Sequence, residues 1–146
     1  MPITDKGWLV IGYGNDLRGD DAVGPQVVDK IAEMDLANVR TITGFQLLPE
    51  MAAEAAEADS VVFVDAAVDL LQVSVERIVH MAPSAITHIG SPHELISLSR
   101  AVYGSDPAAW FVKIPALQFE LGAPLSELTE RCAREAVDRI RGLIEG

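Results

Sequence analysis

The chain has 146 residues, of which 49% are hydrophobic and 23% are charged, and its formal net charge is -11. This composition fits one folded domain over residues 1–146 and argues against disorder. The negative charge disfavours binding to nucleic acids and to anionic membrane surfaces. No stretch approaches the roughly 18 consecutive apolar residues of a membrane span, and residues 1–6 leave no room for a signal peptide. We therefore expect a soluble, cytoplasmic protein.

Apolar runs typical of buried strands alternate along the chain with amphipathic runs typical of helices. Strands are expected at residues 8–11, 39–42, 61–64, 73–79 and 110–114, and helices at 23–34, 49–58, 91–102 and about 126–144. The third helix has a capping box, with Ser91 as N-cap, Pro92 at the first helical position and Glu94 closing the box. The alternation predicts an α/β fold with a mostly parallel sheet, in which ligands bind beyond the carboxyl ends of the strands.

The loop after the first strand, residues 14–21, is the first candidate for chemistry. It ends in Asp20 and Asp21, where the next helix begins. A carboxylate at that position is favoured by the positive end of the helix, so a simple N-cap is the plain alternative. Only one of two adjacent acids can be the cap, which leaves the other for a functional role.

Two further candidates follow in the chain. Asp65 comes directly after the apolar run 61–64, where a buried carboxylate needs water, a donor or a cation, although a solvated loop residue is an equal alternative. His93 is the second residue of the helix that starts after Ser91, and the positive helix end favours the neutral, metal-binding imidazole. Two carboxylates and one imidazole suit a borderline divalent ion such as nickel or zinc.

Other classes of site fit the sequence poorly. The turn Gly12-Tyr13-Gly14 resembles the start of a dinucleotide-binding motif, but Leu17 stands where the third glycine belongs and acids fill the loop. There is no G-x-S-x-G elbow. Cys132, the only cysteine, lies on the apolar stripe of the last helix and is expected in the core.

Three segments, taken together, carry a family resemblance. Residues 11–24, Ile-Gly-Tyr-Gly-Asn-Asp-Leu-Arg-Gly-Asp-Asp-Ala-Val-Gly, match a G-x-G-N-x-L-x-x-D-[DE]-x-x-G signature, residues 61–65 match a hydrophobic strand that ends in aspartate, and residues 91–95 match Ser-Pro-His-x-Leu. In order and spacing the chain resembles the nickel-iron hydrogenase maturation proteases. The resemblance implies a single-domain, three-layer sandwich with a twisted sheet flanked by helices.

The resemblance also implies a function and its residues. Members of this family remove the C-terminal extension of a hydrogenase large-subunit precursor after nickel insertion, and they recognise nickel that the substrate carries. The metal-contacting trio corresponds here to Asp21, Asp65 and His93, and these are the expected catalytic residues. Asp20 would support the site or cap the helix. Ala22 stands where many members have glycine.

Two other functions remain open on the sequence. A non-catalytic, nickel-binding checkpoint or assembly protein could hold the same precursor without cutting it. A stand-alone metallohydrolase with its own zinc could act on a small molecule, but three candidate ligands, two of them carboxylates, predict weak intrinsic affinity for a metal.

Overall fold

The computed structural model describes residues 6–79 and 90–146. The elements follow one another as β1 (Trp8–Tyr13), a 3-10 turn η1 (Gly19–Ala22), α1 (Val23–Glu33), β2 (Val39–Gly44), α2 (Met51–Ala56), β3 (Ser60–Ala67), β4 (Ser74–Arg77), α3 (Pro92–Tyr103), β5 (Ala108–Pro115) and α4 (Glu127–Glu145). The strands form one sheet in the order β2-β1-β3-β5-β4. All neighbours pair in parallel except β4, which is antiparallel to β5.

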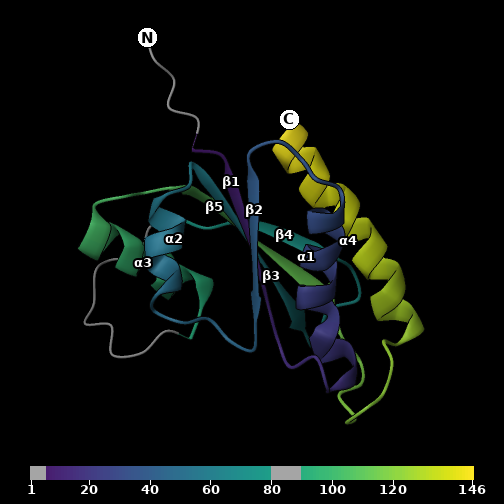
Figure 1. Ribbon diagram of the computed structural model, residues 1–146. Helices are drawn as coiled ribbons and strands as arrows, with labels where there is room; N and C mark the ends of the chain where they lie inside the picture. The colour runs from purple at the N-terminus through teal and green to yellow at the C-terminus, as the bar shows by residue number, and fades with distance from the viewer. Residues whose placement is uncertain (1–5, 80–89) are drawn as a thin grey trace.

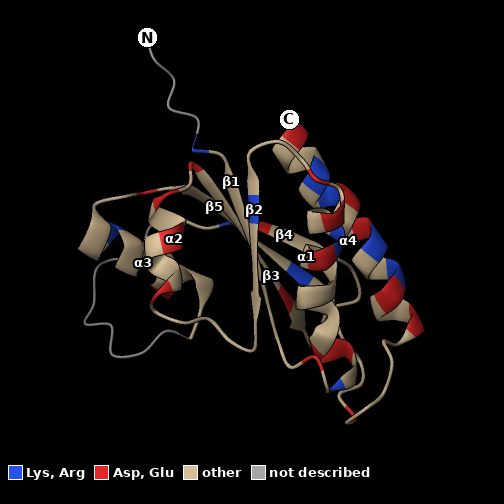
Figure 2. Cartoon of the chain, in the orientation of Figure 1, with Lys and Arg blue, Asp and Glu red and all other residues tan. Residues whose placement is uncertain are grey.

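Helices cover both faces of this sheet (Figure 1), with α1 and α4 on one side and α2 and α3 on the other. The expected three-layer α/β sandwich with a mostly parallel sheet is therefore confirmed. Positively and negatively charged residues are both spread along α4, and charged residues also occur along α1 (Figure 2). In the described part of the chain, no helix is both long and apolar enough to cross a membrane.

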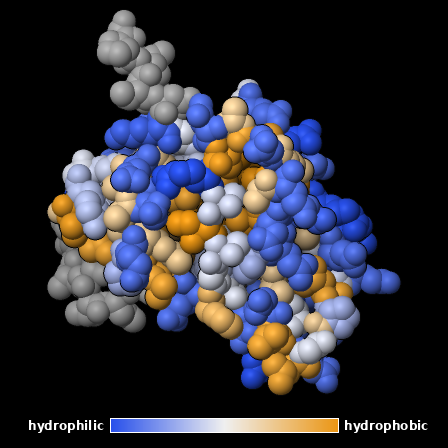
Figure 3. Space-filling model, viewed as in Figure 1, coloured by the Kyte–Doolittle hydropathy of each residue, from blue (hydrophilic) through white to orange (hydrophobic). Residues whose placement is uncertain are grey.

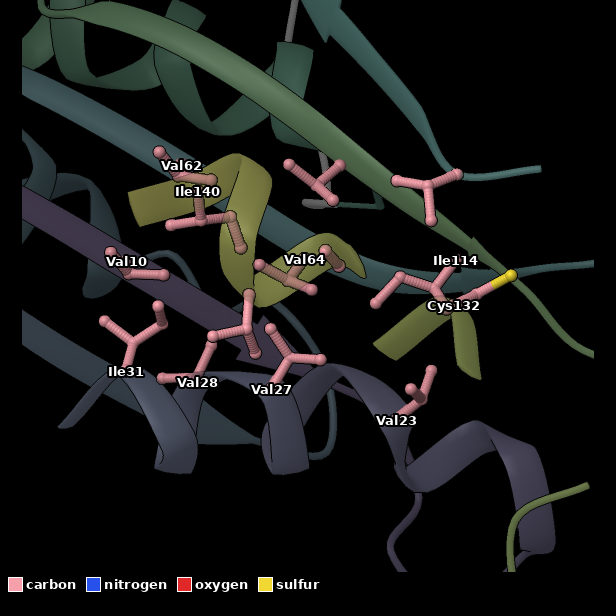
Figure 4. Packing of buried hydrophobic residues seen from close by; sticks show 14 residues of the cluster. Val10, Val23, Val27, Val28, Ile31, Val62, Val64, Ile114, Cys132 and Ile140 are labelled. Carbon is pink, nitrogen blue, oxygen red and sulfur yellow. The ribbon is translucent and has the colours of Figure 1, made fainter. Parts of the chain in front are cut away.

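The central strands are apolar on both faces because each face is covered by helices. Val10 and Val62 belong to the core under α1 and α4, whereas their neighbours Leu9 and Phe63 belong to the core under α2 and α3. This alternation follows from the two-residue period of a strand. Figure 4 shows the first of these cores, which includes Cys132, so the expected core position of this cysteine is confirmed.

Helix starts were predicted better than strand ends. Ser91 accepts a hydrogen bond from the Glu94 amide at 3.3 Å, and Ser126 accepts one from the Thr129 amide at 3.3 Å, so both expected N-caps are confirmed. The strand expected at 73–79 is shorter and lies antiparallel at the sheet edge. The helix expected at 49–58 is likewise shorter, spanning Met51–Ala56.

The parallel strands β1, β2, β3 and β5 all end at the same side of the sheet, which is the lower side in Figure 1. We call this side the carboxyl edge. The loops that leave it are residues 14–18 after β1, 45–50 after β2, 68–73 after β3 and 116–126 after β5. These loops and the strand ends from which they leave hold the candidate site.

Candidate active site

Glycines shape the loop that follows β1. Gly14 has a φ of 150°, and a Cβ atom built there would lie 2.1 Å from the carbonyl oxygen of Asp21. A Cβ atom on Gly24 would lie 2.6 Å from the Val64 carbonyl oxygen and 2.7 Å from that of Tyr13. Because only glycine permits these approaches, the loop can fold back and α1 can start directly against β1 and β3. The spacing of the motif thus has a steric cause.

Asp21 is held by the loop that precedes it. Its carboxylate accepts a hydrogen bond of 2.7 Å from the amide of Asn15, whose own side chain accepts one of 2.9 Å from the Leu17 amide. Neither η1 nor α1 has a side-chain cap, so the interpretation of Asp20 or Asp21 as a helix N-cap is wrong. Asp21 instead ties the loop ends together and remains half-buried.

Asp65 lies within β3, beside Asp21, rather than just after the strand. The strand continues to Ala67, and the Asp65 carboxylate accepts a hydrogen bond of 2.8 Å from the amide of Ala66. Burial raises the pKa of Asp65 to about 7, and the nearby negative charge of Asp21 adds to the rise, while the Ala66 amide and the Tyr13 hydroxyl oppose it. The two carboxylates therefore lie close enough for the charge of one to act on the other.

Tyr13 is a member of this site that the sequence did not reveal. It is the last residue of β1, and its hydroxyl donates a hydrogen bond to Asp65. Burial raises the pKa of Tyr13 well above its ordinary value, and the charge of Asp65 raises it further, so the hydroxyl stays protonated as a donor. Its residue type and its place in a Gly-x-Gly turn did not predict a role in the site.

His93 lies in a different environment. It is half-buried near the start of α3 and lines a small cavity of about 180 Å³ together with Ile96 and Arg100 of the same helix and Ile78 and Ala108 of the sheet side. Within residues 6–79 and 90–146, no three His, Cys, Asp or Glu side chains lie close enough together to hold a metal ion. The structure thus brings Asp21 and Asp65 together but does not add His93 as the third ligand of a ready-made metal centre.

Asp20 has a role that differs from that of its neighbour. It is fully buried, and its carboxylate accepts hydrogen bonds from the amides of Leu117 (2.7 Å), Gln118 (3.0 Å) and Ser126 (2.7 Å) and from the Ser126 hydroxyl (2.8 Å). Burial by itself raises the pKa of a carboxyl, but these bonds outweigh it and hold the pKa of Asp20 below its ordinary value. Asp20 therefore fixes residues 116–126 against the loop that carries Asp21.

The site does not coincide with a larger groove on the protein. That groove, of about 720 Å³, runs between α1 and α4 and is lined by residues such as Val27, Met34 and Val137. Neither Asp21 nor Asp65 lines it. Asp21 and Asp65 lie at the carboxyl edge, whereas His93 lines the separate cavity beside Ile78 and Ala108.

Comparison with known proteins places the fold. No protein-family model matches the chain, and no curated protein matches its sequence. Among solved structures, the [NiFe] hydrogenase maturation protease HycI from Thermococcus kodakarensis KOD1 is 24% identical with a TM-score of 0.72, over 98% of this chain and 95% of that one. The hydrogenase maturating endopeptidase HybD from E. coli is 21% identical with a TM-score of 0.70, over 95% and 92%. The [NiFe] hydrogenase maturation protease HybD from Thermococcus kodakarensis is 18% identical with a TM-score of 0.72, over 94% and 99%. The chain therefore has the fold of hydrogenase maturation proteases over nearly its whole length.

Proposed function

We propose that this protein is an endopeptidase that removes the C-terminal extension of a nickel-loaded nickel-iron hydrogenase large-subunit precursor. The observation that carries the proposal is the pair of Asp21 and Asp65 at the carboxyl edge, with a pKa of about 7 for Asp65. This pair stands on a fold shared with proteins that are hydrogenase maturation proteases. The motif around residues 11–24 supports the same activity.

The carboxylate pair suits peptide hydrolysis. A group with a pKa near the working pH can both take and return a proton, so Asp65 can accept a proton from the water that attacks the scissile carbonyl carbon. It can then pass that proton to the leaving amide nitrogen as the C–N bond breaks. The Tyr13 hydroxyl orients the Asp65 carboxylate through its hydrogen bond. Asp21 keeps a second negative charge beside it.

Nickel enters the proposal as part of the substrate. Asp21 and Asp65 provide oxygen ligands that can contact a metal ion presented by the precursor and so position the scissile bond. His93 is proposed as the third contact because it stands in the Ser-Pro-His-x-Leu segment at the start of α3. Since no described cluster forms a three-ligand site, we infer that His93 approaches the metal only when the precursor is bound.

Intact-mass measurement tests the proposal directly. The large-subunit precursor encoded in the same genome is incubated with the protein, once loaded with nickel and once nickel-free. Loss of a C-terminal peptide from the nickel-loaded form alone is the expected result. The Asp65→Asn variant should leave the precursor intact, whereas Asp35→Asn, which changes an exposed aspartate after α1 with a positive φ that asparagine tolerates, should cleave normally.

The same experiment separates the non-catalytic alternative. A precursor that binds the protein but keeps its mass, with and without nickel, would refute the peptidase and favour a checkpoint protein. Cleavage that does not depend on nickel would refute the recognition of substrate metal while leaving the peptidase activity in place.

A further inference from the structure

Large apolar side chains on the loops of the carboxyl edge are open to solvent. Nine large hydrophobic residues of the described chain are more than half exposed, and six of these lie on the loops of the carboxyl edge. We call these six the apolar rim: Leu17, Phe45, Val68, Leu71, Leu117 and Leu121, with exposed fractions of 61%, 65%, 57%, 80%, 61% and 66%. Apolar side chains gathered in this way commonly mark an interaction surface.

Hydrogen bonds between the loops bring members of the apolar rim next to one another. The Gly122 amide donates to the Leu17 carbonyl at 2.8 Å, and Arg18 forms a β-bridge with Leu121. The Ala116 amide donates to the Ala67 carbonyl at 3.0 Å. Val68 and Leu117 are the next residues in the chain after this hydrogen-bonded pair. Backbone hydrogen bonds therefore link the loop after β5 both to the loop after β1 and to the end of β3. Figure 3 shows exposed apolar residues at the lower end of the molecule, where this edge lies.

One loop of this edge, residues 116–126, is held in place by buried hydrogen bonds. The four hydrogen bonds that Asp20 accepts fix residues 117, 118 and 126, and a Cβ atom on Gly19 would lie only 2.7 Å from the Gln118 carbonyl oxygen. Burying a carboxylate carries a desolvation cost, which these hydrogen bonds offset. Because the loop is already ordered, its exposed leucines lose little conformational freedom when a partner binds, which favours affinity.

Acidic residues lie among the apolar side chains. The four loops carry the exposed acids Asp16, Glu50, Asp69 and Glu120, and Arg18 is their only basic residue. Asp21 and Asp65 add further carboxylates behind them. An apolar segment bearing lysine or arginine complements such a surface, whereas an acidic segment is repelled.

We propose that the apolar rim is the docking surface for the precursor, and that it receives an apolar polypeptide segment flanked by basic residues. This inference rests on the proposed function, because continuity with the carboxylate pair makes the protein substrate its occupant. Binding of that segment places the adjoining chain over Asp21 and Asp65. The rim would contribute to KM, and the carboxylates to kcat.

The test measures initial cleavage rates against the concentration of nickel-loaded precursor for the wild type and for the double variant Leu17→Ser, Leu121→Ser. The variant should raise KM about tenfold or more, because the two leucine side chains would otherwise be buried against the bound precursor. The kcat should stay the same. The matched control is Val102→Ser, which changes a side chain that is 61% exposed on α3, away from the carboxyl edge, and should leave both constants unchanged. Asp16→Lys should raise KM and flatten its dependence on salt, whereas Glu33→Lys on α1 should not.

The outcomes separate this inference from the proposed function. Cleavage with an unchanged KM in the leucine double variant overturns the docking surface and leaves the peptidase standing. If the wild type binds but does not cleave, the peptidase fails, and weakened binding of the same variant in biolayer interferometry still supports the docking surface. A wild type that does not bind the precursor overturns both. If sedimentation shows that the leucines hold two copies of this chain together and KM is unaffected, the rim is a dimer interface instead.

Discussion

Replacing Asp65 by asparagine should stabilise the fold while removing the proposed catalytic group. In the folded protein the pKa of Asp65 is raised to about 7 from an ordinary value of 3.8, because the carboxyl is buried and lies near Asp21. Ionised Asp65 is thus a source of instability. Asparagine has a similar shape and can keep an oxygen acceptor for the Ala66 amide and the Tyr13 hydroxyl, but it cannot ionise.

The sign and size of the effect follow from linkage. A raised pKa means that the folded state binds the proton more tightly than the unfolded state does, so wild-type stability falls as pH rises from about 4 to about 7 and then levels off. Each unit of pKa difference corresponds to about 1.4 kcal/mol. The full difference sets an upper limit of about 4 kcal/mol above pH 7, and we expect about 2–4 kcal/mol in favour of the variant. Near pH 4 the two proteins should be almost equally stable.

Urea unfolding of wild type and variant at pH 4, 5, 6, 7 and 8 measures this difference, with a chelator present to keep metal ions away from the carboxylates. Asp69→Asn, measured in the same way, is the control for replacing an exposed aspartate by asparagine. A difference between Asp65→Asn and wild type that does not change with pH would refute the assignment of the raised pKa to this carboxyl.

Four further predictions concern neighbouring groups. Asp20→Ala should lower the free energy of unfolding by about 3 kcal/mol or more, because buried amides lose their acceptor; a loss below about 1 kcal/mol in urea unfolding would contradict this role. Gly14→Ala should unfold at lower temperature and lose precursor cleavage, since its Cβ atom would meet the Asp21 carbonyl at 2.1 Å; calorimetry and mass analysis check both, and wild-type behaviour would argue against the loop geometry. His93→Ala should abolish processing with its melting temperature unchanged, and normal processing would remove His93 from the trio. The kcat/KM for processing, which reports the free protein, should fall about tenfold per pH unit below the Asp65 pKa of about 7, and a flat profile from pH 5 to 8 would exclude Asp65 as the base.

The layered fold was predictable because its signals are local. The apolar run at 61–64 and the capping box from Ser91 to Glu94 each depend on a few adjacent residues, and the structure has a strand and a helix there. The antiparallel direction of β4 was not predictable, because nothing within residues 74–77 states which neighbour the strand pairs with. The predicted length of β3 was too short for a similar reason. The strand continues through Asp65 because β5 pairs with it as far as Pro115.

The candidate site was predicted in part. The pairing of Asp21 with Asp65 follows from the rule that parallel strands end at one edge, and the structure brings these two side chains together. Tyr13 was missed because its role depends on a hydrogen bond to a residue 52 positions away along the chain. The trio with His93 remains a prediction, since a substrate-borne metal ion is part of the geometry that would unite it.

Asp20 and Asp65 show why residue type alone could not assign these roles. Both are aspartates withdrawn from water, and burial raises the pKa of each. Asp20 meets three amides and a hydroxyl, which stabilise its charge and make it a structural acceptor. Asp65 meets one amide and one hydroxyl and faces a second negative charge, so its proton remains exchangeable near neutral pH. The number of hydrogen-bond donors around each carboxylate therefore distinguishes Asp20, which holds the loop 116–126, from Asp65, which can carry a proton. Asp21, next to Asp20 in the chain, accepts a hydrogen bond from the Asn15 amide, and its negative charge helps to raise the pKa of Asp65.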